Sequence, residues 1–173
     1  MNYPKFNYRM SMPTPWGKAD HVERRGDFLF VSTPSHGGIM IGKEKARRNL
    51  TESARRLGMM SGAFLCYEED CLAAIPQFEC PEEFFSMYQK TESPAAMRKS
   101  AVETIKRWNP EYFDLLESEY RARPESRERI KELLSFHVSS FVDDHIKVLA
   151  VGEASAKVSA AVSKAMADVF KTL

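Results

Sequence analysis

The chain has few cysteines, no long apolar run and no excess of charge of either sign. Its three cysteines are an odd number with the spacing C-x4-C-x8-C, which disfavours a disulfide framework and favours a reducing cytoplasm. No stretch approaches the roughly 18 apolar residues that a membrane-spanning helix requires. The start, MNYPKFNYRMSMP, lacks the apolar segment of a signal peptide, so we expect no leader.

The near-zero net charge excludes two classes of electrostatic protein. Lysine and arginine number 25 against 24 aspartate and glutamate residues. The chain is therefore neither a polyanionic nucleic-acid mimic nor a globally basic nucleic-acid coat. Any electrostatic partner must be met by a local patch.

Most residues suited to chemistry lie in the N-terminal half. Residues 14–80 contain two of the four histidines and all three cysteines, whereas 81–173 has the pattern of helices with ordinary surfaces. We therefore expect an α+β fold, with a small antiparallel sheet in the N-terminal half followed by a mostly α-helical C-terminal half. The expected division is a motif-bearing unit at 1–90 and a helical extension or bundle at 91–173, packed as one body.

Short runs rich in aromatic and β-branched residues predict the strands. These strands are 19–23, 27–33, 38–42 and 62–67, and residues 1–15 are expected to form an extended arm. If the first two strands pair through a turn centred on Arg25-Gly26, His21 lies opposite Phe30 and diagonal to Ser32.

Proline positions and helix propensity predict the helices. One basic helix is expected at 43–57 and should end at Gly58. The segment just before Pro76 is expected to form at most one helical turn, because proline interrupts a helix. Ser93 and Asn109 are suitable N-caps for two later helices. The later helices are predicted at 81–90, 94–108, 110–122, 124–150 and 153–171.

Three motifs in this order resemble an uncharacterised domain family carried by bacteriophages, plasmids and integrative elements. They are WGKADHVE at 16–23, STPSHGG at 32–38 and YEEDC at 67–71, and the resemblance covers about residues 14–85. It implies a mobile element in a bacterial host as the context, and it supplies no activity.

The three motifs contain the candidate site residues. If the segments converge, two imidazoles, hydroxyls and loop amides would form an anion-binding or acid–base site, closed by the carboxylates of YEED. The catalytic candidates are His21, Ser32, His36, Glu68, Glu69 and Asp70, and the binding candidates in the loop are Ser35, His36, Gly37 and Gly38. The structural alternative is a turn in which serines bond the local backbone and the glycines supply positive φ.

We expect no cofactor and no tightly bound metal, because no local spacing fixes two ligands. A sharper alternative combines His21, His36 and one carboxylate, with Cys66 or Cys71 making a zinc-like set. A serine nucleophile is disfavoured because G-x-S-x-G is absent. A Cys71 nucleophile is disfavoured because neighbouring carboxylates raise a thiol pKa.

Two further regions have candidate partners. The basic helix 43–57, including Arg47 and Arg48, can contact nucleotide or nucleic-acid phosphates, although such a run is more often a solvated face. The apolar stripe of 153–173 either packs on the preceding helix or forms a homodimer or host-protein contact. His137 is expected to be a core-edge histidine.

The first functional interpretation is a cytoplasmic accessory protein of a phage or plasmid that binds a host or defence-system protein. The alternatives are a small metal-dependent or acid–base enzyme acting on a nucleotide or phosphorylated substrate, and a DNA-binding regulator that uses 43–57. No membrane partner is expected.

Overall fold

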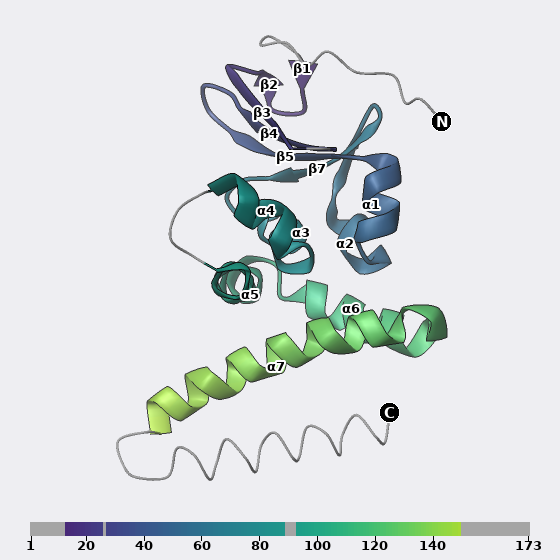
Figure 1. Ribbon diagram of the computed structural model, residues 1–173, viewed down its shortest axis with the longest axis vertical. Helices are drawn as coiled ribbons and strands as arrows, with labels where there is room; N and C mark the ends of the chain where they lie inside the picture. The colour runs from purple at the N-terminus through teal and green to yellow at the C-terminus, as the bar shows by residue number, and fades with distance from the viewer. Residues whose placement is uncertain (1–12, 26, 89–92, 150–173) are drawn as a thin grey trace. The chain divides into compact units, whose positions relative to one another are not determined.

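A computed structural model describes residues 13–25, 27–88 and 93–149 of the chain (Figure 1). The chain divides into two compact units, Met1–Tyr112 and Phe113–Leu173. The helix at Pro94–Trp108 belongs to the first unit, although it lies beyond the boundary expected at residue 90.

A five-stranded antiparallel sheet organises the first unit. Its spatial order is β3-β4-β5-β7-β6, and every neighbouring pair is antiparallel. The strands are β3 His21–Arg25, β4 Phe28–Ser32, β5 Gly37–Gly42, β6 Met59–Ser61 and β7 Phe64–Glu68. All four predicted strands are present, β6 was missed, and the α+β class is confirmed.

Both faces of the sheet are buried, which explains the nearly continuous apolar sequence of its central strands. One face carries Ile39, Ile41 and Tyr67, each at most 2% exposed. The opposite face carries a cluster of Leu29, Val31, Met40 and Cys66 with Ala19, against which Trp16 packs. Trp16 lies between β1 Pro13–Thr14 and β2 Gly17–Lys18, which pair as a short hairpin. The extended arm expected at 1–15 ends within this hairpin.

The register of the first hairpin differs from the prediction. His21 pairs directly with Ser32, and Glu23, not His21, pairs with Phe30. The ladder closes on the pair Arg25 and Phe28, so the turn is centred one residue later than expected. This shift places His21 and Ser32 side by side across the strands.

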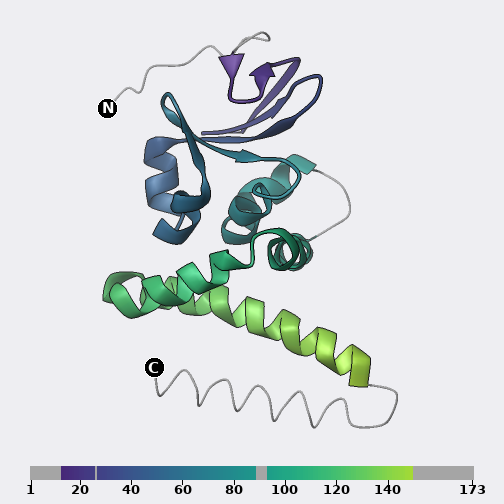
Figure 2. The ribbon, with the colours of Figure 1, turned by 180° about the vertical axis from the view of Figure 1, so that it is seen from behind.

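The helices of the first unit lie on one side of the sheet, and the β1–β2 hairpin lies on the other (Figures 1 and 2). They are α1 Lys43–Asn49, α2 Glu52–Leu57, α3 Ala74–Glu79, α4 Pro81–Tyr88 and α5 Pro94–Trp108. Phe84 of α4 contacts Phe28 and Phe30 of the sheet edge-on, with ring centroids 5.1 and 5.5 Å apart. Ser93 caps α5 as predicted, because its side chain accepts a hydrogen bond from the Ala96 amide.

The predicted single helix over 43–57 is wrong. Leu50 adopts extended backbone angles and ends α1, and Thr51 then begins α2 as its N-cap by accepting a hydrogen bond from the Ala54 amide. Threonine is a good N-cap because its hydroxyl satisfies an otherwise unpaired amide of the first turn. Leu50 is buried at this break, 3% exposed.

The expectation that Pro76 ends a helical turn is also wrong. Pro76 lies in the first turn of α3, Ala74–Glu79, where the amide of the third residue has no intrahelical acceptor. Its missing N–H therefore costs no helical hydrogen bond. The helix continues to Glu79, whose carboxylate takes part in a buried network described below.

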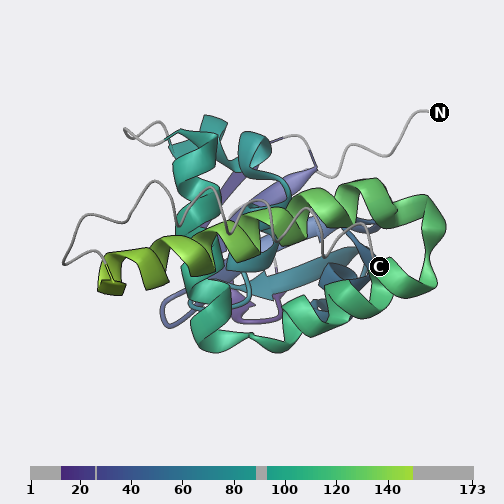
Figure 3. The same cartoon turned by 90° about the horizontal axis from the view of Figure 1, so that it is seen from below.

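The second unit begins within α6, Glu111–Ala122, and continues through η1 Pro124–Ser126 into α7 Arg127–Leu149 (Figure 3). Phe113 and His137 stack with ring centroids 3.6 Å apart, which agrees with a histidine at the edge of an apolar core. Asn109 does not act as the predicted N-cap, since it ends α5 and its side-chain amide donates to the Cys71 carbonyl. The predicted helix at 153–171 lies outside the described residues.

None of the helices in the described ranges has the length and hydrophobicity needed to cross a lipid bilayer.

Candidate functional site

The candidate residues gather at one end of the sheet, where β4 turns into β5. The turn is tied by Thr33, whose amide donates to the His36 carbonyl at 2.7 Å and whose hydroxyl donates to the same carbonyl at 2.6 Å. The His36 amide in turn donates to the Thr33 hydroxyl at 3.1 Å. The Thr33 hydroxyl therefore reinforces the backbone of the STPSHGG turn, a role that no spacing in the sequence indicates.

The YEEDC motif lies beside this turn, as predicted. Gly38 pairs with Glu68 in the β5–β7 ladder. One residue further on, the Glu69 amide donates to the Gly37 carbonyl at 3.1 Å. Segments separated by some thirty residues in sequence thus form one continuous edge.

The two glycines of this edge are required for space and not for positive φ. Among the described glycines only Gly17 and Gly62 have positive φ, so the expected role of Gly37 and Gly38 is corrected. A Cβ on Gly37 would lie under 3.0 Å from the Val31 carbonyl and the Glu69 carboxylate, and a Cβ on Gly38 would lie under 3.0 Å from the Tyr67 carbonyl and the Trp16 ring. Contacts that close would force a neighbour to move.

The first motif joins the edge from the other side. The Asp20 amide donates to the Ser32 carbonyl at 2.9 Å, and His21 pairs with Ser32. Because Ser32 also pairs with Gly37, these three residues form one cross-strand row. The Glu69 carboxylate lies over the Gly37 end of that row.

The side chains of this edge are largely exposed, whereas its backbone is bonded. Asp20, His21, Ser32, Ser35, His36, Glu69 and Asp70 are all exposed. Glu68 is half-buried, and its carboxylate accepts hydrogen bonds from the Asp70 amide at 3.1 Å and the Cys71 thiol at 3.5 Å. We call the exposed side chains within 20–21, 32–36 and 69–70 the sheet-end surface.

The cysteines near this surface are poor nucleophiles in their observed surroundings. Burial raises the pKa of the Cys71 thiol, and the hydrogen bond and negative charge of Glu68 raise it further. Burial alone raises the pKa of Cys66 to about 11. Both thiols are therefore protonated at neutral pH. Among the described residues, no three His, Cys, Asp or Glu side chains are grouped so that they could hold a metal ion.

A second polar cluster, which we missed in the sequence, is buried under the helices. The Glu79 side chain accepts hydrogen bonds from the Thr51 amide at 2.8 Å, the Thr51 hydroxyl and the Tyr112 hydroxyl at 2.6 Å. Tyr67 lies nearby, donates to the Ala54 carbonyl at 2.9 Å, and has its pKa raised first by burial and then by the Glu79 charge.

This Glu79 cluster holds the break between α1 and α2 in place. Its residues come from α2, α3 and α6, and Glu79 is 6% exposed. The one sign of this cluster in the sequence is the single glutamate within the apolar run AAIPQFEC. A carboxylate in such a run is expected to be buried, and a buried carboxylate needs hydrogen-bond donors. The position of its partners could not be read from that signal.

The binding candidates Arg47 and Arg48 lie apart in the fold, in the last turn of α1. Both are exposed. They are not part of the sheet-end surface.

One family model matches the chain over residues 9–137, and it is described as a domain of unknown function, DUF7007. The chain belongs to this family. The match extends well past residue 85, so the helical segments through α6 and the first half of α7 are part of the family domain, unlike the shorter resemblance found from the motifs. No curated protein and no solved structure matched the chain.

The DUF7007 domain includes every candidate residue from His21 to Asp70, the Glu79 cluster and both short basic helices.

Proposed function

We propose that this DUF7007 protein is a cytoplasmic, non-enzymatic accessory protein of a phage or plasmid. It binds a host or defence-system protein through the sheet-end surface. The mobile-element context comes from the three motifs, and the binding role comes from the form of the surface.

One observation carries this proposal: the backbone of the turn is fixed from within while its side chains project. Thr33 closes the turn, and Gly37 is held to Glu69 by a backbone hydrogen bond. Ser35 and His36 at its tip are exposed. A loop that is already ordered loses less entropy when it binds, so it suits recognition by a protein partner.

Site-specific photocrosslinking in host cells tests the proposal. A benzoylphenylalanine replacing Ser35 should give one discrete crosslinked host protein, and the same probe at exposed Lys131 of α7 should not. The crosslink at residue 35 should weaken at least about tenfold when His21 and Asp70 are both changed to alanine, as expected for loss of about 1.4 kcal/mol of binding. No discrete product at residue 35, or equal products at both positions, would reject the sheet-end surface as the contact.

A second candidate function rests on the cross-strand row. His21 stands directly opposite Ser32, and the Glu69 carboxylate lies over the next position, Gly37. A histidine beside a hydroxyl can act as a general base, which would suit hydrolysis of a phosphorylated substrate. Turnover of p-nitrophenyl phosphate that is lost in both Ser32→Ala and His21→Gln, and retained in Ser35→Ala, would favour this enzyme over the binding protein.

A further inference from the structure

The segment that forms two short helices, α1 and α2, has a local excess of positive charge. Residues 43–57 contain six basic and two acidic residues, whereas the whole chain has a net charge of +1. The rest of the chain therefore has more acidic than basic residues. This segregation marks α1 and α2 as the place where a polyanion would meet the protein.

The break at Thr51 folds this charge into a compact face. The Arg55 guanidinium of α2 donates to the Leu50 carbonyl at 2.5 Å and to the Arg47 carbonyl at 3.5 Å. Arg55 thereby ties α2 against the last turn of α1, and Thr51, held by Glu79, fixes the break from the buried side. A continuous helix over 43–57 would instead spread the same arginines along its length.

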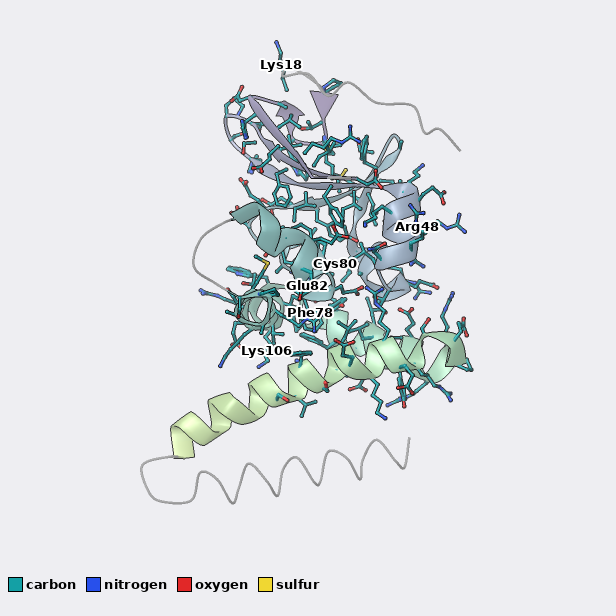
Figure 4. All side chains as sticks on the ribbon, viewed as in Figure 1. Lys18, Arg48, Phe78, Cys80, Glu82 and Lys106 are labelled. Atoms are coloured by element: carbon teal, nitrogen blue, oxygen red, sulfur yellow. The ribbon has the colours of Figure 1, made fainter. Side chains whose placement is uncertain are left out.

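Four cations are left on the outside of this helix pair, which we call the α1–α2 face. Lys43 and Arg48 are exposed, and Figure 4 shows Arg48 projecting from α1 away from the body of the first unit. The side chains of Arg47 and Arg56 are 72% and 64% exposed. Ala46, Leu50 and Ala54 are buried and Leu57 is half-buried, so the exposed side chains of α1 and α2 are all charged.

The two carboxylates on this face do not neutralise it. Glu44 lies 3.8 Å from Arg47, and Glu52 lies 2.5 Å from Arg56. Surface pairs of this kind contribute at most about 1 kcal/mol and are easily exchanged for a stronger anion. Three of the four cations are arginines, whose planar forks match phosphate oxygens in a bidentate manner.

We infer that the α1–α2 face binds the phosphate backbone of a nucleic-acid duplex without reading its sequence. The two helices have seven and six residues, too few to present the successive side chains with which a recognition helix reads base edges. The exposed side chains of both helices are charged, and the exposed Met59 and Met60 lie in β6, so this face is poorly suited to insertion into a membrane surface. This surface is separate from the sheet-end surface, so its test is independent of the proposed function.

Fluorescence anisotropy of the full chain with a fluorescein-labelled 24-base-pair DNA duplex tests the inference at several salt concentrations. We expect binding that weakens steeply with salt, because each neutralised phosphate adds about 0.9 to the slope of log K against log salt. The triple variant Arg47→Gln, Arg48→Gln, Arg56→Gln should bind at least tenfold more weakly, with the slope reduced by about 2–3.

A matched control removes the same charge elsewhere. Arg107→Gln, Arg121→Gln, Arg123→Gln changes three exposed arginines outside the face, and it should bind DNA within about twofold of the original chain. Glu44→Gln on the face should strengthen binding. Circular dichroism should show the same helix content for all variants.

Three outcomes would overturn the inference. They are undetectable DNA binding at 50 mM salt, an equal loss in the control variant, and tighter binding to phosphatidylserine vesicles than to the duplex. The second would assign binding to net charge alone, and the third would assign the face to lipid.

Discussion

The two polar clusters of the first unit both contain carboxylate and hydroxyl side chains, but they differ in whether backbone groups or side chains make the hydrogen bonds. At the sheet-end surface, hydrogen bonds hold the backbone, and the side chains of Ser35, His36 and Asp70 are exposed. In the Glu79 cluster the side chains themselves bond one another across three helices, and they are buried. The buried side chains of the Glu79 cluster therefore maintain the fold, whereas a partner can reach the exposed side chains of the sheet-end surface.

The energetic difference follows from burial. When a buried carboxylate or its donors lose their hydrogen-bond partner, water cannot replace that partner, and the unpaired group destabilises the fold. An exposed side chain that is removed is replaced by solvent at little cost. Stability should therefore depend on Glu79 and hardly at all on His36.

The largest expected effect is that of Glu79→Ala. This change leaves the Thr51 amide and hydroxyl and the Tyr112 hydroxyl without their acceptor, so the free energy of unfolding should fall by about 3–5 kcal/mol. Urea unfolding followed by circular dichroism measures the loss. A fall below about 1 kcal/mol would show that water enters the cluster and would remove the contrast between the two sites.

Gly38→Ala should give the next largest effect. Its new Cβ would meet the Tyr67 carbonyl and the Trp16 ring under 3.0 Å, and overpacking of this kind costs about 1–3 kcal/mol. Gly42→Ala is the control in the same strand, because the nearest atom to its Cβ is 4.0 Å away. Equal thermal shifts in the two variants would contradict the close approach at Gly38.

Much of the fold could be predicted because its signals are local. Val, Ile and Phe at alternating or continuous positions predicted the strands, and Ser93 before Pro94 predicted the start of α5. The predicted register of β3 on β4 was wrong because the turn is centred one residue later than expected. No residue within the two strands specifies the position of that turn. The helix break at Thr51 depends on Glu79, 28 residues away, so helix propensity alone predicted one helix.

The candidate site was predictable in its residues and less so in its construction. The polar motifs indicated that the turn and YEED would lie together, and the backbone hydrogen bond from Glu69 to Gly37 confirms this contact. Thr33 was overlooked because a threonine after a strand has no distinctive spacing. The role of Gly37 and Gly38 was misassigned because a sequence does not show whether a glycine serves a turn or a close contact.

Alkaline pH should expose a smaller effect in the buried sheet. Burial raises the pKa of Cys66 from 9.0 to about 11, so the unfolded state loses its thiol proton first as pH rises. The stability contributed by the protonated thiol is complete below pH 9 and is lost between about pH 9 and 11. Unfolding midpoints measured from pH 8 to 11 should fall less steeply in Cys66→Ala than in the original chain, and parallel curves would show that other groups dominate.

The smallest expected change in stability is that of His36→Ala, and it gives the sharpest test of the comparison. The His36 side chain is exposed, whereas its amide and carbonyl make the hydrogen bonds to Thr33 that hold the turn. Alanine retains both backbone groups, so the free energy of unfolding should change by no more than about 0.5 kcal/mol.

Thr33→Ala is the matched variant for His36→Ala, because it removes the bonding hydroxyl and leaves the imidazole in place. If the exposed imidazole contacts the partner and the turn must be ordered before it binds, both variants should weaken the crosslink at residue 35, and only Thr33→Ala should also speed amide hydrogen exchange at residues 33–37. A large loss of stability in His36→Ala, with the crosslink unchanged, would make the histidine a structural residue and leave the sheet-end surface without its proposed role.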